Sequence, residues 1–338
     1  MKKIRVGIIG YGLSGRYLQI PFFLHHPKFE LVSVVTSQSL DLPASVNKLT
    51  DIQDVIKDSS IDLISICSPN ETHVSYVRLA LEANKHVLVE KPMAVTEAEM
   101  KTLFALSKEK NKVLAVFQNR RWDSDFLTVK KVIQSGILGK IVRLEIRFDR
   151  FKQALNVKKW KEVSIPTNGI LYDLGAHIID QAIDLFGTPA AITGKTYMER
   201  PNSAISDAFD VLLDYTDGPS VLLHASLLAL EPLPRYVVYG TEGSFIKYGI
   251  DIQEDQLKEG VSPLAAHFGE ESPEFQGVVS VWQEGKKVSY RVPTEKGNWM
   301  ALFDSLADAI QGVSSYKITD NELFVQGKIY DTLQKRSS

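Results

Sequence analysis

The first third of the chain alternates short apolar runs with stretches in which apolar residues recur every three or four positions. The runs predict β-strands and the recurring stretches predict helices. We expect the strands at residues 4–9, 29–36, 61–67, 86–89 and 113–117, and the helices at 15–24, 52–57, 73–83 and 96–110. This alternation is typical of an α/β fold with a doubly wound parallel sheet.

The pattern changes near residue 122. A helical stretch to about residue 134 is followed by long segments in which apolar and polar residues alternate, which predicts a large, mainly antiparallel open sheet in a second α/β domain. These segments are residues 142–150, 209–215, 220–225 and 236–239, and two helical patterns follow at 299–311 and 321–333. Because 338 residues exceed what one core usually organises, we predict two domains, residues 1–121 and 122–338.

Composition limits the kinds of partner that the chain can have. It carries 39 basic and 41 acidic residues, which does not indicate binding to nucleic acid or to a membrane surface. No stretch approaches the roughly 20 apolar residues of a membrane-spanning helix, and the N-terminus lacks a signal-peptide pattern. The single cysteine, Cys67, fits a reducing compartment. We therefore expect a cytoplasmic protein that acts on small molecules.

A glycine-rich turn, Gly10-Tyr11-Gly12-Leu13-Ser14-Gly15, follows the first predicted strand and opens the first predicted helix. In such a turn the first glycine permits a tight exit from the strand, the second lets a pyrophosphate approach the backbone, and the third lets helix and strand pack closely. The position between a strand and a helix favours dinucleotide binding over a purely structural turn.

The end of the second predicted strand bears on which nicotinamide cofactor binds. NAD sites usually place a carboxylate there to hold the ribose hydroxyls, whereas this chain has Thr36, Ser37 and Gln38. Without a carboxylate a 2′-phosphate is not repelled, and Ser37 and Gln38 can donate hydrogen bonds to it. The pattern favours NADP, with NAD as the alternative and an ordinary polar loop as the structural reading.

Two further strand ends carry polar residues, and ligands bind at this edge of a parallel sheet. Ser68-Pro69-Asn70-Glu71-Thr72-His73 follows one strand, so Asn70 and His73 can face the ribose or nicotinamide, although Asn70 also suits a helix cap. Glu90-Lys91-Pro92 follows the next strand. An ammonium at Lys91 would polarise a substrate oxygen, and the alternative is a solvated surface lysine.

Asp173 and His177 are four residues apart at a predicted helix start and share one helical face. An imidazole is suited to accept a hydroxyl proton near neutral pH, so His177 is the candidate base and Asp173 the candidate orienting group. The alternative is a pair that satisfies each other structurally. No recognisable zinc-ligand spacing accompanies them, so we predict no metal site.

In this order, the glycine turn, Ser-Pro-Asn with a nearby His, Glu-Lys-Pro and Asp-x-x-x-His resemble the Gfo/Idh/MocA oxidoreductases across nearly the whole chain. Residues 118–128, 172–181 and 245–251 are similar to the branch of NADP-dependent scyllo-inositol dehydrogenases. The resemblance implies a Rossmann domain, then an α/β substrate domain whose open sheet often forms a homodimer. It also implies hydride transfer between NADP(H) and a secondary hydroxyl of a cyclic polyol or sugar.

The resemblance implies three groups of site residues. The catalytic residues are Lys91, Asp173 and His177. The residues expected at the substrate are Lys91, Trp122, Asp123, Tyr172, Asp173 and His177. The residues expected at the cofactor are Gly10, Gly12, Leu13, Ser14, Gly15, Ser37, Gln38, Ser68, Asn70, His73, Glu90, Lys91 and Asn119.

The chain departs from this branch at Gln38, where members typically have arginine, and residues 40–50 look short. The first departure weakens the expected preference for NADP. Two other functions occur in this superfamily: cofactor-binding sensors without turnover, and glycosidases that use NAD without net redox change. Lys91 and His177 favour an enzyme over a sensor, and a firmly retained cofactor would favour the glycosidase.

Overall fold

The computed structural model describes residues 2–156 and 162–337. The chain divides into two compact units, each built from three segments. The first unit comprises Met1–Asn119, Gln253–Phe268 and Asn298–Asp320, and the second comprises Arg120–Ile252, Gly269–Gly297 and Asn321–Ser338. The predicted boundary at residues 121 and 122 lies close to the first division. The two later segments of the first unit differ from the prediction, which placed them with residues 122–338.

Helix packing explains why the later segments belong to the first unit. Helix α8 (Met300–Ile310) packs against α1 (Ile20–His25), where the ring of Phe303 stacks on that of Phe22 with centroids 4.7 Å apart. Helix α7 (Gln253–Lys258) packs against the π-helical turn η1 (Ser14–Gln19). Both segments therefore bury their apolar side chains in the first unit.

The first unit contains a six-stranded sheet in the order β3-β2-β1-β4-β5-β6, and every neighbouring pair is parallel. This confirms the predicted doubly wound sheet. The strands are β1 (Ile4–Ile9), β2 (Phe29–Val35), β3 (Asn47–Leu49), β4 (Leu63–Ile66), β5 (His86–Val89) and β6 (Leu114–Val116).

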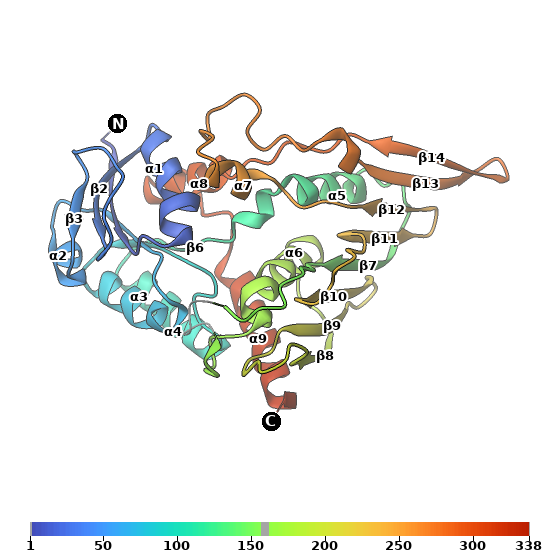
Figure 1. Cartoon of the computed structure of the whole chain (residues 1–338), viewed down its shortest axis with the longest axis horizontal. Coiled ribbons are helices and arrows are strands. Elements are labelled where there is room, and N and C mark those ends of the chain that lie inside the picture. The colour runs from blue at the N-terminus through green and yellow to red at the C-terminus, as the bar shows by residue number, and fades with distance from the viewer. Residues whose placement is uncertain (1, 157–161, 338) are drawn as a thin grey trace. The chain divides into compact units, whose positions relative to one another are not determined.

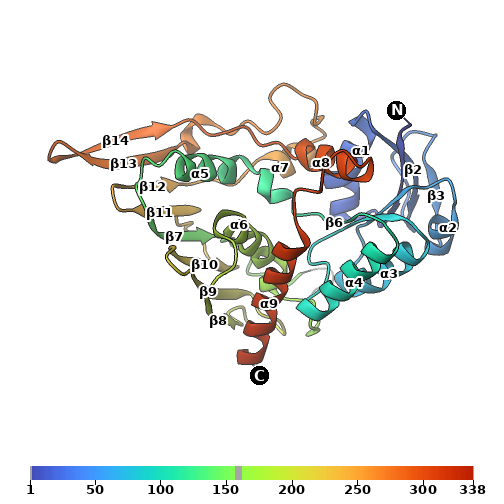
Figure 2. The ribbon, with the colours of Figure 1, turned by 180° about the vertical axis from the view of Figure 1, so that it is seen from behind.

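Helices cover both faces of this sheet. Figures 1 and 2 show α3 (His73–Glu82) and α4 (Glu97–Glu109) on one face, and α1 and α8 on the other. Helix α2 (Ile52–Lys57) connects β3 to β4. Short polar caps start two of the helices: Asp51 accepts a hydrogen bond from the amide of Gln53, and Thr96 accepts one from the amide of Glu99.

The second unit contains an eight-stranded sheet in the order β14-β13-β12-β11-β7-β10-β9-β8. The β7–β10 pair is parallel and the other pairs are antiparallel, which confirms the mainly antiparallel sheet. The strands are β7 (Ile141–Arg147), β8 (Ala191–Tyr197), β9 (Ala208–Asp214), β10 (Ser220–Ser226), β11 (Tyr236–Gly240), β12 (Gly243–Lys247), β13 (Gly277–Gln283) and β14 (Lys286–Val292).

One face of this sheet is covered by α5 (Ser124–Gln134), α6 (Ala176–Phe186) and α9 (Asp320–Ser337) (Figures 1 and 2). The other face bears no helix of the described chain (Figures 1 and 2). Residues of β12 and β13 on this face are partly or fully exposed. Ile246, Val278 and Trp282 are exposed apolar residues of this face, whereas Phe245 and Val279 beside them are buried under the helices. Two short 3₁₀ turns, η3 (Asn119–Trp122) and η6 (Pro273–Phe275), connect these elements.

None of the described helices is both long enough and apolar enough to cross a membrane.

Candidate functional site

The first unit gathers its predicted site residues along one edge of the sheet. Because all six strands are parallel, their carboxyl ends lie at the same edge. The glycine turn follows β1, the segment from Thr36 follows β2, the segment from Ser68 follows β4, Glu90 follows β5 and Asn119 follows β6. The fold thus brings together the residues that we predicted to bind a dinucleotide.

The three glycines of the turn differ in the space that a side chain would have at each position. Gly10 has a φ of 105°, and a Cβ there would lie 2.6 Å from the carbonyl oxygen of Cys67. A Cβ on Gly15 would lie 2.2 Å from the carbonyl oxygen of Gly10. Around Gly12, by contrast, a Cβ would meet no atom within 4 Å. The chain's own packing requires Gly10 and Gly15, while Gly12 leaves open backbone, and this arrangement fits a cofactor pyrophosphate.

The carboxylate of Glu90 connects β5 to the glycine turn. The Ser14 hydroxyl and the Gln19 side-chain amide both donate hydrogen bonds to Glu90, the second at 3.0 Å. Gln19 in turn accepts a hydrogen bond from Ser65 of β4 at 2.5 Å. Glu90 also accepts a hydrogen bond from the backbone amide of Lys91 at 3.1 Å. These contacts join the glycine turn, β4 and the end of β5 at Glu90, the residue that precedes Lys91.

His73 lies behind this edge rather than at its surface. Its side chain is 0 % exposed, and its Nδ1 and Nε2 lie 2.8 Å from the carbonyl oxygen of Pro92 and 3.0 Å from that of Ser68. Burial lowers the pKa of His73. Both ring nitrogens face the protein's own backbone, and the expected contact with the cofactor stays a prediction. His73 joins the Ser68 turn to the segment that follows Lys91.

The remaining cofactor candidates take different positions along the edge. Ser37, Gln38 and Leu13 are exposed, and the backbone amide of Gln38 donates a hydrogen bond to the Thr36 hydroxyl at 3.0 Å. Asn70 begins the short turn η2 (Asn70–Thr72) and is partly exposed. Asn119 is buried at the start of η3.

In the second unit, Asp173 and His177 lie on one continuous helical segment. A π-helical turn, η5 (Leu171–Gly175), leads directly into α6. Asp173 is exposed, whereas His177 is only 6 % exposed and its ring lies 6.4 Å from that of Phe148, centroid to centroid. The predicted helical spacing is confirmed, and the imidazole lies in a mostly buried aromatic environment.

Two predicted substrate residues have partners inside the second unit. Asp123 is 0 % exposed and forms an ion pair with Arg120 at 3.0 Å. Tyr172 is buried, and its hydroxyl accepts a hydrogen bond from Gln334 of α9 at 2.5 Å. The contact of both residues with substrate hydroxyls stays a prediction, and the Tyr172 hydroxyl still has its own proton to donate. Trp122, the third, is partly exposed.

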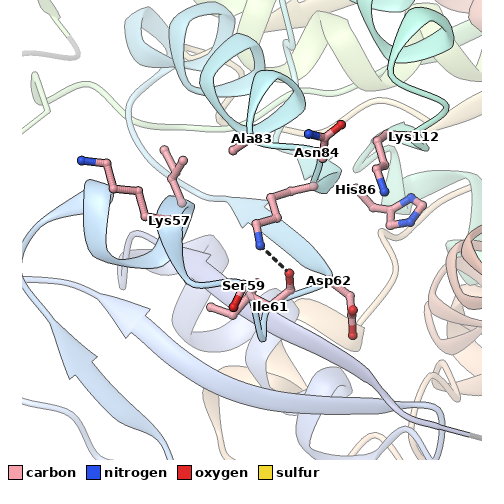
Figure 3. Close-up of a pocket in the computed structure, with 10 residues that line it drawn as sticks. Lys57, Ser59, Ile61, Asp62, Ala83, Asn84, His86 and Lys112 are labelled. Carbon is pink, nitrogen blue, oxygen red and sulfur yellow. Dashed lines mark hydrogen bonds between the residues drawn. The ribbon is translucent and has the colours of Figure 1, made fainter.

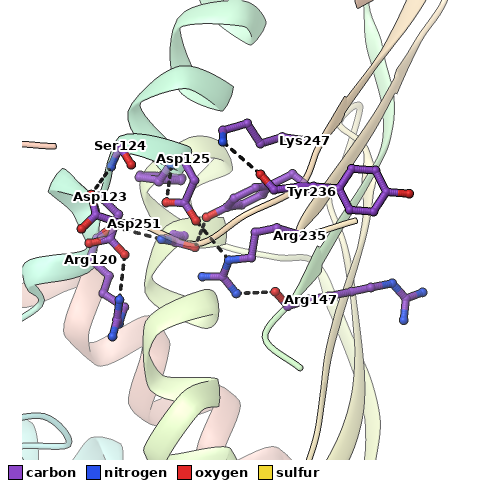
Figure 4. A network of polar contacts seen from close by, with 12 residues as sticks. Arg120, Asp123, Ser124, Asp125, Arg147, Arg235, Tyr236, Lys247 and Asp251 are labelled. Carbon is purple, nitrogen blue, oxygen red and sulfur yellow. Dashed lines mark hydrogen bonds and ion pairs between the residues drawn. The ribbon is translucent and has the colours of Figure 1, made fainter. Parts of the chain in front are cut away.

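Asp123 belongs to a polar network inside the second unit (Figure 4). Arg235 pairs with Asp125 at 3.3 Å, and its guanidinium lies 4.0 Å from the centroid of the Phe148 ring. The Tyr236 hydroxyl donates a hydrogen bond to Gln181 at 3.0 Å. The sequence did not predict this network, because its members lie far apart in the chain.

Arg121 forms a second buried cluster in this unit. Its guanidinium makes two hydrogen bonds of 2.8 Å to Asp180 and one of 2.9 Å to Glu322 of α9. Burial raises the pKa of Asp180 to about 6, although Arg121 acts in the opposite direction. Arg121 and Asp180 therefore hold η3, α6 and α9 together.

Two other features of the described residues bear on function. The described residues contain no group of three His, Cys, Asp or Glu side chains that could hold a metal ion.

A cavity of about 440 Å³ lies where β4 and β5 begin, at the edge opposite the glycine turn (Figure 3). Lys57, His86 and Lys112 line it, and Lys85 beside them donates a hydrogen bond to the Ile61 carbonyl at 2.8 Å. This cavity is separate from the candidate cofactor edge.

The parallel sheet with its glycine turn is the fold of a dinucleotide-binding unit, and a second α/β unit accompanies it. A family model described as "Oxidoreductase family, NAD-binding Rossmann fold" matches residues 4–118, and the "GFO/IDH/MocA C-terminal domain" model matches residues 126–246. The chain belongs to the Gfo/Idh/MocA oxidoreductase family.

Its relatives include proteins of similar length. The uncharacterized oxidoreductase YdgJ of Escherichia coli is 38% identical over 91% of this chain and 89% of its own. The scyllo-inositol 2-dehydrogenase (NADP(+)) IolW of Bacillus subtilis is 34% identical over 94% of this chain and 89% of its own. The solved structure of the YPO2259 putative oxidoreductase from Yersinia pestis has a TM-score of 0.92 and 35% identity, and covers 100% of this chain and 97% of that one.

Proposed function

We propose that this protein is an NADP-preferring dehydrogenase that interconverts a secondary hydroxyl and a ketone on a cyclic polyol or sugar, with scyllo-inositol as the leading substrate. The observation that supports the proposal is the hydrogen bond from the Ser14 hydroxyl of the glycine turn to the carboxylate of Glu90, the residue that precedes Lys91. The similarity to a scyllo-inositol 2-dehydrogenase supports the substrate class.

In this proposal the open backbone at Gly12 holds the cofactor's pyrophosphate. A nicotinamide cofactor held there would supply the acceptor for the carbon-bound hydrogen of the alcohol, which leaves as a hydride. The Lys91 ammonium donates a hydrogen bond to the alcohol oxygen and stabilises negative charge on it. His177 accepts the hydroxyl proton, and Asp173 positions substrate and imidazole. Reduction of the ketone follows the same steps in reverse.

Lys91 provides the test of this assignment. Lys91→Ala should lower kcat for scyllo-inositol by about 100- to 1,000-fold, because a positioned charge on the reacting oxygen is lost. Binding of NADPH, followed by its fluorescence, should stay close to that of the native protein. Lys57→Ala, which removes an exposed lysine at the other edge of the sheet, is the control. Unchanged turnover in Lys91→Ala would remove the catalytic role.

We further propose that the open face of the eight-stranded sheet pairs with a second copy of the chain. Three exposed apolar side chains of this face, Ile246, Val278 and Trp282, support a protein contact there.

A cytoplasmic location stays a prediction from the composition. The presence of Lys91 and His177 favours turnover over a sensor that only binds cofactor.

A further inference from the structure

The loop after β2 needs a cation if it is to prefer a 2′-phosphate, because that group is strongly negative. The side chains that the sequence offers there, Ser37 and Gln38, are neutral. Hydrogen bonds from neutral donors are weaker than those from charged donors. A preference for NADP therefore requires a positive charge that comes from elsewhere in the fold.

The neighbouring strand supplies that charge. Strand β3 runs parallel to β2, with Lys48 opposite Val34, and the amide of Thr36 donates a hydrogen bond to the Leu49 carbonyl at 2.9 Å. The Lys48 ammonium lies 3.4 Å from the carbonyl oxygen of Ser37 and donates to it. Lys48 is exposed, so its charge remains available to a ligand at this loop.

The other charges near the loop balance each other. Arg16 lies 3.8 Å from Asp41 and stacks over the rings of Tyr11 and Tyr17 at 5.5 and 5.1 Å. The Tyr11 hydroxyl accepts a hydrogen bond from the amide of Asp41 at 3.3 Å, which fixes the far end of the loop. Lys48 forms no ion pair with a carboxylate among the contacts of the described residues, so its positive charge is uncompensated.

We infer that Lys48 is the residue that recognises the 2′-phosphate of NADP, assisted by the Ser37 hydroxyl and the Gln38 amide. This inference rests on the proposed function, since it presupposes a nicotinamide cofactor at the glycine turn. A lysine ammonium binds phosphate as a mobile point charge, which suits a residue that reaches across from an adjacent strand. Arg16 and Tyr11 shape the loop rather than read the phosphate.

Binding measurements on the full-length protein test the inference without turnover. The probes are NADPH and NADH, titrated by nicotinamide fluorescence, and adenosine 2′,5′-bisphosphate and 5′-AMP, titrated by calorimetry. Lys48→Ala should weaken binding of NADPH and of the bisphosphate by about five- to ten-fold, as expected for an exposed ion pair with a doubly charged group. Binding of NADH and AMP should change less than about two-fold.

Two further variants sharpen the result. Lys48→Glu should reverse the preference so that NADH binds more tightly than NADPH, because the carboxylate repels the phosphate and can accept from ribose hydroxyls. Lys57→Ala, an exposed lysine on α2 at the other edge of the same sheet, should leave both affinities unchanged. Thermal unfolding of each variant shows whether the unit remains folded.

Each remaining outcome has a definite meaning. If Lys48→Ala retains the affinity for NADPH, or loses NADPH and NADH equally, Lys48 does not read the 2′-phosphate and the inference is overturned. If the native protein binds NADH as tightly as NADPH, the proposed preference itself fails and the inference falls with it. The effect of Lys91→Ala on turnover is independent of both results.

Discussion

Replacing Gly12 and Gly15 separately by alanine should have opposite consequences, although the two changes are chemically identical. Gly12 has open space where a Cβ would project, whereas a Cβ on Gly15 would lie 2.2 Å from the Gly10 carbonyl oxygen. Ordinary contact begins at 3.4 Å, so the Gly15 variant must shift its backbone by about 1.2 Å. Gly12→Ala requires no such shift.

The expected magnitudes follow from these distances. Gly15→Ala should lower the free energy of unfolding by about 1–3 kcal/mol, the usual penalty of overpacking. Gly12→Ala should change it by less than about 0.5 kcal/mol, because the added methyl group meets no atom of the chain. The same methyl group occupies the place where a pyrophosphate approaches, so Gly12→Ala should raise the Kd of NADPH about ten-fold, or about 1.4 kcal/mol.

Urea unfolding and NADPH titration measure the two quantities, and each variant serves as the other's control. If Gly12→Ala binds NADPH as tightly as the native protein, the pyrophosphate does not lie against Gly12. If Gly15→Ala is as stable as the native protein, the close contact with Gly10 does not constrain the turn.

Two further predictions concern stability and assembly. Burial lowers the pKa of His86 from 6.5 to about 4, so as the pH falls the unfolded chain takes up a proton at this residue before the folded chain does. The free energy of unfolding therefore decreases by about 3 kcal/mol between pH 6.5 and pH 4. Asn in His86→Asn keeps an acceptor for the Val113 amide but does not titrate. In urea unfolding, the free energy of unfolding of this variant should fall between pH 7 and pH 4 by about 3 kcal/mol less than that of the native protein. An equal fall in both proteins would contradict the lowered pKa of His86. Ile246→Glu would place a charge in the proposed contact between two copies, so light scattering should show a mass closer to that of the monomer. Leu264→Glu, at an exposed position of the first unit, is the control. An unchanged mass of Ile246→Glu would exclude this face as the contact between copies.

Strong local patterns predicted much of the fold. The strands at 4–9 and 86–89 and the helix at 52–57 have the predicted bounds, because apolar periodicity and neighbouring turn residues agree there. Strand β3 was missed because its three residues are too short to show a period. The β13–β14 hairpin was also missed, although Glu284-Gly285, both with positive φ, marks its turn.

The candidate site, like the fold, was predictable from the sequence only in part. Motif residues that follow strands came together because a parallel sheet fixes where its strands end. The side chains that hold them could not be predicted, since pairs such as Arg121 with Asp180 and Arg235 with Asp125 join residues 59 and 110 positions apart. The partners of Asp123 and Tyr172 were likewise not predicted: Asp123 pairs with Arg120, and the Tyr172 hydroxyl accepts a hydrogen bond from Gln334.

The central claim is that a hydrogen moves from a ring carbon of a polyol to the nicotinamide. Incubating the native protein with NADP and scyllo-inositol deuterated on its carbons, then measuring the mass of the NADPH, tests it directly. We expect NADPH that carries one deuterium, and about 100- to 1,000-fold less of it from Lys91→Ala over the same period. NADPH formed without deuterium, or no NADPH from scyllo-inositol, myo-inositol or glucose while the cofactor still binds, would contradict it.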